Sequence, residues 1–219
     1  MKVVVTGSSK GIGLAVSQLF LEYGHEVHGI DILESAIQDN KQYFHYVADV
    51  RNKFGLPHIQ DVDILINNAG CQNSDDDIET NLKGLINCTE VYGLSPNIKS
   101  IVNMASVSAH NGAEFPRYAA SKGGVLSYTK WTATEIAKYG GHATCNSLSF
   151  GGVLTDLNAQ VMYDESKWKE IMEVTPLKKW ATTREAAEWT YFIAVVNKSM
   201  TGQDIIIDNG ESSYTKFVW

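Results

Sequence analysis

The stretch K-V-V-V-T-G-S-S-K-G-I-G, residues 2–13, joins a short β-branched run to a glycine-rich turn. Valines at positions 3–5 favour a buried strand, because β-branched side chains pack well on a pleated surface. The glycines then permit a tight turn, and residues 14–23 have the apolar spacing of an amphipathic helix. The free N–H groups at such a helix N-terminus favour a pyrophosphate. The stretch therefore predicts a strand, a phosphate-binding turn and a helix.

Outward from this unit, β-branched runs alternate with stretches of helical spacing. Helical spacing recurs at residues 81–92, 118–138 and 184–195, and β-branched runs occur at residues 26–30, 44–48, 63–66, 100–105, 143–149 and 204–208. This alternation implies βαβ units. We therefore predict an α/β fold, a Rossmann-like doubly wound parallel β-sheet of about seven strands with helices on both faces. No linker or repeat interrupts the pattern, so residues 1–219 are interpreted as a single domain.

Composition and charge narrow the class of partner. The hydrophobic content of 44% and charged content of 20% are ordinary for a globular protein. The net charge of -7 argues against nucleic acid or an anionic membrane as partner, since both require clustered Lys and Arg. Cys71, Cys88 and Cys145 are far apart and form no C-x-x-C, which indicates reduced thiols in the cytoplasm and no metal site.

Polar and small residues that follow the predicted strands form the candidate site, because ligands bind beyond the carboxyl ends of parallel strands. Asp31 follows the second strand, where a carboxylate accepts hydrogen bonds from an adenosine ribose and repels a 2′-phosphate. The next three strands are followed by D-V, N-N-A-G and a serine, at residues 49–50, 67–70 and 106.

The stretch Y-A-A-S-K places Tyr118 and Lys122 four residues apart. On a helix these positions share a face, so the phenol and the ammonium point into the same space. A nearby cation favours the phenolate, and we therefore expect the pKa of Tyr118 to fall below its usual value of about 10. A tyrosine tuned in this way is a usable general acid or base. For an isolated Y-x-x-x-K, a packed tyrosine and a solvated lysine are the alternative.

Together these motifs resemble the short-chain dehydrogenase/reductase family. The resemblance rests on T-G-x-x-x-G-I-G, N-N-A-G, a serine 12 residues before Y-x-x-x-K and the tail T-G-Q-D-I-I-I-D, and it extends from Lys2 to Gly210. It implies an oxidoreductase that transfers a hydride between a nicotinamide cofactor and a secondary alcohol or ketone. A 3-oxoacyl-type reductase using NADPH and a non-catalytic dinucleotide-binding module are the alternatives.

The resemblance also implies roles for individual residues. Tyr118 matches the general acid/base, and Lys122 matches the lysine that lowers the tyrosine pKa and binds the nicotinamide ribose. Ser106 matches the residue that orients the substrate oxygen, and Asn81 the asparagine that holds a water in a proton relay. The implied cofactor contacts are Gly7, Ser9, Lys10, Gly11, Ile12, Gly13, Asp31, Ile32, Asp49, Val50, Asn68, Ala69, Gly70, Tyr118, Lys122, Val153 and Thr155.

Two of these residues favour different cofactors. Asp31 favours NAD(H), because its carboxylate would stand beside a 2′-phosphate, whereas Lys10 precedes Gly11 at a position that is often basic in relatives using NADP. Repulsion between two unit charges 4 Å apart costs about 4 kcal/mol at an effective dielectric constant near 20. A semi-exposed lysine returns less than that. NAD(H) is therefore the expected cofactor, with NADP(H) as the alternative.

The chain departs from the family pattern in two places. Phe150 stands where the family usually has proline, which leaves the backbone before Val153 and Thr155 less constrained. The link after Asp49 is short, and we expect only a stub helix at residues 51–56. The family's substrate lid corresponds to residues 156–180, which include apolar residues that suit a small or medium hydrophobic substrate.

The remaining expectations concern assembly and less specific side chains. The helices after Asn81 and Tyr118 are those that pair in family members, so a homodimer or homotetramer is expected. Ser108 is a poorer match than Ser106, and His110 is interpreted as a surface or packed residue. The acidic run at residues 75–77 is interpreted as a solvated loop. The tryptophans are interpreted as packing or interface residues: Trp131, Trp168, Trp180, Trp189 and Trp219.

Overall fold

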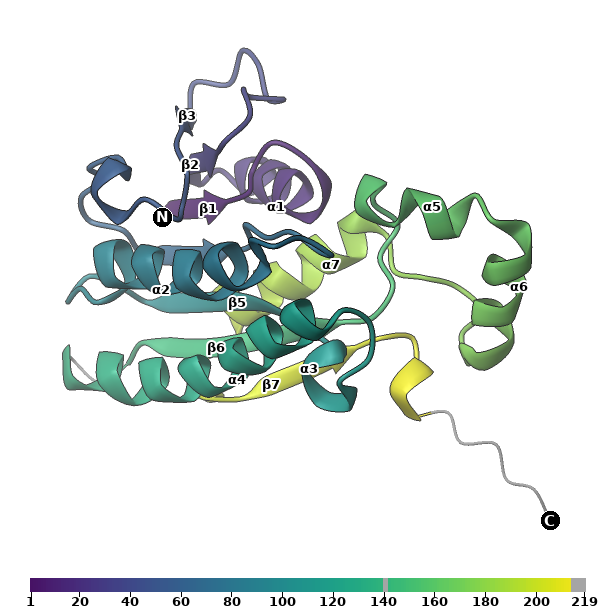
Figure 1. The fold of residues 1–219 in the computed structure, drawn as a ribbon. Helices are drawn as coiled ribbons and strands as arrows, with labels where there is room; N and C mark the ends of the chain where they lie inside the picture. The colour runs from purple at the N-terminus through teal and green to yellow at the C-terminus, as the bar shows by residue number, and fades with distance from the viewer. Residues whose placement is uncertain (140–141, 214–219) are drawn as a thin grey trace.

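A seven-stranded parallel sheet forms the centre of the molecule in the computed structural model, which describes residues 1–139 and 142–213 (Figure 1). The strand order is β3-β2-β1-β4-β5-β6-β7. Its strands are β1 (Lys2–Thr6), β2 (Glu26–Asp31), β3 (Tyr43–Val47), β4 (Ile64–Asn67), β5 (Ser100–Ser106), β6 (Thr144–Phe150) and β7 (Asp204–Ile207). The order reverses between β1 and β4, which is where doubly wound sheets bind ligands. The predicted fold class is confirmed.

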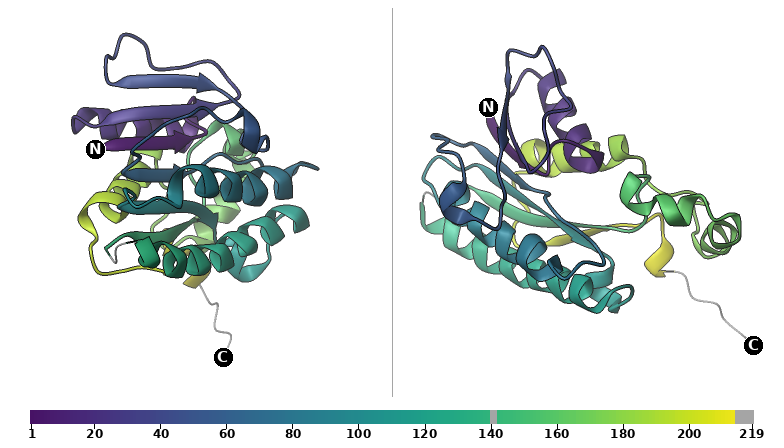
Figure 2. Two further views of the ribbon diagram at one scale, coloured as in Figure 1. Left: turned by 90° about the vertical axis from the view of Figure 1, so that its left-hand side faces the viewer. Right: turned by 45° about the horizontal axis from the view of Figure 1, so that its top comes forward.

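Helices cover both faces of this sheet (Figure 2). One face carries α1 (Gly11–Glu22) and α7 (Thr183–Tyr191), which pack against each other. The other face carries α4 (Pro116–Ile136) and the helix of residues 79–93, in which α2 (Leu85–Cys88) lies between two π-helical turns. The short helix α3 (Ser108–Asn111) follows β5, and α5 (Ala159–Met162) and α6 (Glu165–Val174) project from the sheet (Figure 1).

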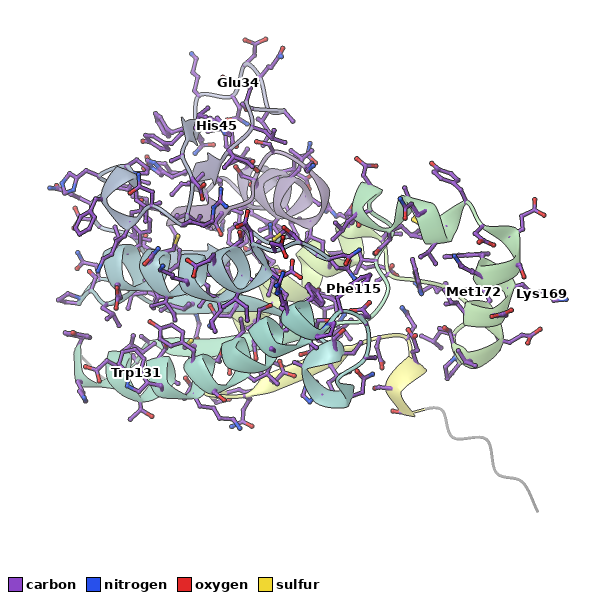
Figure 3. All side chains as sticks on the ribbon, viewed as in Figure 1. Glu34, His45, Phe115, Trp131, Lys169 and Met172 are labelled. Atoms are coloured by element: carbon purple, nitrogen blue, oxygen red, sulfur yellow. The ribbon has the colours of Figure 1, made fainter. Side chains whose placement is uncertain are left out.

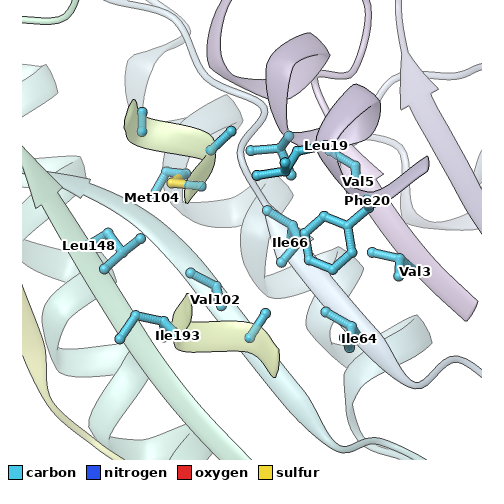
Figure 4. Packing of buried hydrophobic residues seen from close by; sticks show 14 of the residues in the cluster. Val3, Val5, Leu19, Phe20, Ile64, Ile66, Val102, Met104, Leu148 and Ile193 are labelled. Carbon is cyan, nitrogen blue, oxygen red and sulfur yellow. The ribbon is translucent and has the colours of Figure 1, made fainter. Parts of the chain in front are cut away.

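Alternate residues of the central strands supply two hydrophobic cores on opposite faces of the sheet. On β1, Val3 and Val5 pack with Phe20 of α1 in the first core (Figure 4), whereas Val4 joins Tyr92 in the second. This follows from the strand period of two, which sends successive side chains to opposite faces. Full burial of an aliphatic side chain is worth about 1.5–3 kcal/mol. The central strands thus stabilise the helical layers on both faces of the sheet.

Local sequence explains where two of the helices begin. Thr182 caps α7, because its hydroxyl accepts from the Glu185 backbone N–H at 3.1 Å while the Glu185 carboxylate accepts from the Thr182 N–H at 2.8 Å. Such a capping box satisfies two orphan donors of the first turn. Helix α4 starts with Pro116 at its first turn, where the missing N–H costs nothing. The start of α4 fixes the position of Tyr118.

The link between β3 and β4 contains one 3₁₀ turn, Lys53–Gly55, as the short spacing predicted. Its Phe54 is 98% exposed.

Among the tryptophans, Trp180 is buried, Trp131 and Trp189 are exposed, and Trp219 lies outside the described residues. None of the described helices has both the length and the apolar character that a membrane span needs.

Candidate active site

The glycine-rich turn after β1 is closed too tightly for side chains. A Cβ placed on Gly13 would lie 2.0 Å from the Gly7 carbonyl oxygen, and one on Gly7 would lie 2.8 Å from Ala69 Cα. Gly7 also has φ +68°, a left-handed conformation that glycine adopts without strain. The first turn of α1 therefore starts directly against the end of β1, with its backbone N–H groups free of side-chain caps.

The N-N-A-G stretch after β4 holds this turn in place. Asn68 Nδ2 donates to the carbonyl oxygens of Thr6 and Gly7 at 3.0 and 3.1 Å. In return, Thr6 Oγ1 accepts from the backbone N–H groups of Asn68 and Ala69, both at 3.0 Å. Residues about 60 positions apart are thus joined by four hydrogen bonds. The two central strands of the sheet share one rigid loop cluster.

Asp31 lies beside the glycine-rich turn and is 9% exposed. Its carboxylate accepts from the backbone N–H of Ser9 and from that of Leu33, both at 2.9 Å. Two bonds from different segments hold the carboxylate in one orientation. The neighbouring Ile32 is 66% exposed, and Lys10 is exposed at the position before α1. The acid is fixed by two hydrogen bonds, whereas Lys10 is exposed at the start of the helix.

Asp49 and Val50 occupy different environments. Asp49 forms hydrogen bonds with the Arg51 guanidinium at 2.7 to 3.1 Å, and Arg51 also pairs with Asp76 at 2.7 Å. Arg51 holds the pKa of Asp49 below its usual value. Val50 is buried against Gly84, and its carbonyl oxygen accepts from Asn87 Nδ2 at 2.9 Å. The structure therefore keeps the Val50 side chain within the second core.

The segment after β6 reaches back to the glycine-rich turn. A Cβ on Gly11 would lie 3.6 Å from Thr155 Cγ2, so Thr155 stands beside the start of α1. Val153 is buried and bridges to Ala181. A Cβ on Gly152 would meet the Trp180 indole at 2.0 Å, so this tryptophan lies directly over the backbone that follows Phe150. Trp180 in turn contacts Trp168 of α6 edge-on, which anchors the lid segment.

Tyr118 and Lys122 share one face of α4, and the face points toward the end of β5. Lys122 is 6% exposed, and its Nζ donates to the Met104 carbonyl oxygen at 2.8 Å. The same Nζ lies 5.6 Å from the centre of the Tyr118 ring. Ser106, also buried, has its Oγ 3.1 Å from Ser108 Oγ. Three of the four predicted catalytic residues therefore lie together.

The predicted direction of the Tyr118 pKa is wrong for this structure. Burial raises the pKa of Tyr118 to about 12, and a hydrogen bond with Ser106 opposes that rise only in part. Burial also lowers the pKa of Lys122 to about 8. The reason is that both groups are withdrawn from water, and the ammonium bonds a backbone carbonyl instead of the phenol oxygen. Tyr118 is consequently a neutral phenol at physiological pH.

Asn81 connects this face of α4 to the loop after β4. Its Nδ2 donates to the Cys71 carbonyl oxygen at 2.9 Å and to Ser121 Oγ at 3.1 Å, and its Oδ1 accepts from the Cys71 N–H at 2.8 Å. Ser121 precedes Lys122 and donates to the Tyr118 carbonyl oxygen at 2.7 Å. Asn81 sits in a π-helical turn, Glu79–Gly84, a local irregularity that is frequent at functional sites.

Asp77 departs from the solvated loop that was expected for residues 75–77. Asp75 and Asp76 are exposed as expected, but Asp77 is only 1% exposed and lies at the start of the helix that carries Asn81. Its spacing of four residues from Asn81 was the signal that could have identified it. Ser108 is buried and donates to the Glu114 carboxylate, so it continues the hydrogen bonds of Ser106.

His110 and the acidic residues give no metal centre. His110 Nε2 lies 2.8 Å from Asp204 Oδ2 and 3.3 Å from Ser149 Oγ. In the described part of the chain, no three His, Cys, Asp or Glu side chains gather closely enough to hold a metal ion. The polar groups of the candidate site are the Ser106 hydroxyl, the Tyr118 phenol, the Asn81 amide and the Lys122 ammonium.

Comparison with known proteins identifies relatives over nearly the whole chain. A family described as short chain dehydrogenase matches residues 1–166. The 3-oxoacyl-(acyl-carrier-protein) reductase of Chlamydia pneumoniae is 32% identical, with 95% of this chain and 96% of the relative covered. Among solved structures, 4-hydroxyisoleucine dehydrogenase complexed with NADH is 26% identical with a TM-score of 0.85, covering 98% of this chain and 99% of that one. ElxO with NADP bound is 26% identical with a TM-score of 0.84, covering 97% and 98%.

Proposed function

The chain belongs to the short-chain dehydrogenase family, and from this membership we propose that it transfers a hydride between NAD(H) and a secondary alcohol or ketone. Membership makes it an NAD(P)-dependent oxidoreductase. The proposal adds the cofactor preference and the four catalytic residues Asn81, Ser106, Tyr118 and Lys122. Its main support is the burial of Lys122 beside Tyr118 on one face of α4, next to Ser106. A charged group is rarely buried in this way without a function.

The residues around the glycine-rich turn fit a dinucleotide. The close approach of Gly13 to Gly7 leaves the N-terminus of α1 bare, where backbone N–H groups would hold a pyrophosphate. Asp31 would accept from ribose hydroxyls, and Thr155 and Val153 would border the nicotinamide end. The predicted contacts Ser9, Ala69 and Gly70 lie in the same cluster of loops, whereas Ile12 is in the first turn of α1 and packs against the first core. The bound nicotinamide would supply or accept the hydride.

The chain's own residues supply the proton. Because burial keeps Tyr118 neutral, its hydroxyl would donate a proton to the substrate oxygen during carbonyl reduction. The Ser106 hydroxyl would orient that oxygen as a neutral donor. Lys122 would stabilise the phenolate that remains, since a buried ammonium favours a nearby anion. Asn81 would fix the loop after β4 against α4 while the proton is replaced.

NAD(H) is the proposed cofactor because Asp31 is fixed and Lys10 is not. Two backbone N–H groups orient the Asp31 carboxylate, so a 2′-phosphate could not displace it easily. The 3-oxoacyl-type reductase using NADPH is the second candidate, and the chlamydial relative at 32% identity favours it. The lid segment, with Met172 on the projecting helix α6 (Figure 3), would close over either substrate.

We also propose a symmetric dimer. Trp131 is 49% exposed on α4, at the part of the helix remote from Phe115 (Figure 3), and stacks on Tyr128. Val91, on the neighbouring helix, is also exposed. Aromatic side chains are enriched at interfaces, and a two-fold pairing would cover the patch formed by these two helices.

A substrate and cofactor screen tests the proposed function. Purified protein is incubated with NAD or NADP and a panel of secondary alcohols, and with NADH or NADPH and a panel of ketones that includes 3-oxoacyl thioesters. Turnover of a ketone or alcohol with NAD(H), absent in the Tyr118→Phe protein, supports the proposal. Turnover of 3-oxoacyl thioesters with NADPH alone would establish the second candidate. Cofactor binding with no turnover of any substrate would favour a non-catalytic binding module.

A further inference from the structure

The loop that joins β2 to β3 has no helix to hold it in place. Parallel strands are usually joined by a crossover that contains a helix, but residues 32–42 contain none. This loop nevertheless carries Leu33, whose N–H donates to the Asp31 carboxylate at 2.9 Å. A loop without a packed helix needs other contacts to keep one conformation. Polar side chains of the edge strand β3 supply these contacts.

Tyr43 of β3 extends toward the glycine-rich turn. Its Oη lies 3.2 Å from the Oγ of Ser8, which is fully buried. The phenol fits here because β2 has a glycine beside it. A Cβ on Gly29 would lie 2.2 Å from Tyr43 Oη and 2.5 Å from Ser8 Oγ. The contact anchors Ser8, and the peptide that follows carries the Ser9 N–H, which donates to Asp31 Oδ2 at 2.9 Å.

His45 connects the same phenol to the loop after β2. Its Nδ1 lies 3.1 Å from Tyr43 Oη, and its Nε2 donates to the Leu33 carbonyl oxygen at 2.8 Å. Because a carbonyl oxygen only accepts, this bond fixes a proton on Nε2. His45 and Glu34, which follows Leu33, lie at the same end of the molecule (Figure 3). Leu33 is thus held at both polar groups, its carbonyl by His45 and its N–H by Asp31.

These contacts close a ring of hydrogen bonds that begins and ends on the Asp31 carboxylate. Its other members are the Ser8–Ser9 peptide, Tyr43, His45 and Leu33. Both N–H groups that orient the carboxylate therefore belong to segments that side chains of β3 hold in place. A satisfied polar network of this kind makes its members rigid.

We propose that Tyr43 and His45 are positioning residues for cofactor recognition, because they hold Asp31 in the orientation that accepts from an adenosine ribose. The inference rests on the proposed cofactor site, since the two residues of β3 act through Asp31. An Asp31 carboxylate released from the ring can turn away from a 2′-phosphate. Loss of the ring therefore weakens NADH binding and lowers the preference for NADH over NADPH.

The test measures the Kd values of NADH and NADPH by fluorescence titration, which needs no substrate. Tyr43→Phe removes the phenol oxygen and keeps the aromatic ring. A neutral hydrogen bond is worth about fivefold in an equilibrium constant. We expect the NADH Kd to rise about fivefold, and the ratio of the NADPH Kd to the NADH Kd to fall by about the same factor. A purely stabilising role would lower the urea midpoint of Tyr43→Phe and leave this ratio unchanged.

Tyr46→Phe is the matched control. Tyr46 lies on the same strand and packs against the second core, whereas Tyr43 packs against the first. Its Oη also contacts a histidine, at 3.2 Å from His28 Nδ1. Tyr46→Phe thus removes an equivalent hydroxyl from the opposite face of β3, and its Kd ratio should match that of the wild type.

Two further comparisons test whether the effect passes through the ring. His45→Gln can still donate to the Leu33 carbonyl, whereas His45→Leu cannot. The glutamine variant should keep the wild-type ratio within about twofold, and the leucine variant should lower it about fivefold. In the Asp31→Asn protein, adding Tyr43→Phe should change the ratio no further, because residues that act through one another are not additive.

An unchanged ratio in Tyr43→Phe, or an equal fall in Tyr46→Phe, would overturn the proposal. If Tyr43→Phe does not fold, the two His45 variants decide, and equal ratios in both would overturn it. Wild-type protein that binds neither dinucleotide would refute the proposed function and this proposal together. A wild type that binds NADH, with no change in the variants, would refute this proposal alone.

Discussion

The proposed preference for NAD(H) rests on one fixed carboxylate, Asp31, and removing its charge should weaken that preference. Asp31 accepts from the N–H groups of Ser9 and Leu33, and it is almost buried. In Asp31→Asn the side chain keeps its shape and one acceptor oxygen, but the negative charge beside the adenosine ribose is gone. We expect NADPH to bind more tightly and NADH to bind slightly more weakly.

The size of the effect follows from charge separation. A unit charge 4 Å from a phosphate costs about 4 kcal/mol at an effective dielectric constant near 20, which corresponds to roughly a thousandfold in affinity. Salt and water at the open side of the site reduce this, so a change of about 100-fold in the ratio of the two Kd values is expected. Dissociation constants for NADH and NADPH are measured by fluorescence titration, which needs no substrate.

Glu34→Gln is the matched control for this experiment. It removes one negative charge from the exposed loop after β2 (Figure 3) without touching the Ser9 and Leu33 bonds. Its ratio of Kd values should stay within a few-fold of the wild-type ratio. Wild-type protein that binds NADPH better than NADH, or an Asp31→Asn ratio that matches wild type, would refute the reasoning and leave Lys10 as the deciding residue.

Three further outcomes are expected. Tyr118→Phe should lower kcat by at least about 100-fold with the NADH Kd unchanged, and a tenth of the wild-type rate would exclude general acid catalysis. Lys122→Met should raise the free energy of unfolding by about 3 kcal/mol at pH 7, because the native fold lowers the lysine pKa from 10.5 to about 8. The cost of burying the Lys122 ammonium in the wild-type protein is complete below pH 8 and disappears above about pH 10.5. Equal urea midpoints for the wild type and Lys122→Met at pH 7 would contradict this prediction. Trp131→Glu should convert the dimer to a monomer in sedimentation velocity, and a monomeric wild type would contradict the proposed interface.

The sheet and its helices could be predicted from sequence because both depend on periodicity. All seven β-branched runs form strands, and the helix predicted at residues 118–138 starts two residues earlier, at Pro116. Asp31, the glycines and the N-N-A-G stretch lie close together, as expected, because loop positions after parallel strands converge at one edge. The projecting helices α5 and α6 were expected only as part of the substrate lid that the family resemblance implied.

The electrostatics of the site could not be predicted in the same way. The spacing of Tyr118 and Lys122 indicated a shared face, but the pKa of each depends on burial by distant segments, including the loop at Cys71. Asp77 was misjudged for the same reason. Three consecutive acids suggest a solvated loop, and only the packing of their helix against α4 buries the third. The sequence shows which residues carry a charge, but only the folded structure shows which of them are removed from water.

The hydrogen bonds between Asn68 and the β1 turn have a consequence for how the protein matures. The glycine-rich turn is complete only after β4 has paired with β1, and about 60 residues separate the two partners. Pairing over such a separation belongs to the slow part of folding. A dinucleotide would therefore recognise a chain whose two halves have already docked. Because NADH would bind only after the sheet has formed, it would stabilise the folded state and not the folding transition state. Added NADH should therefore slow unfolding much more than it speeds folding.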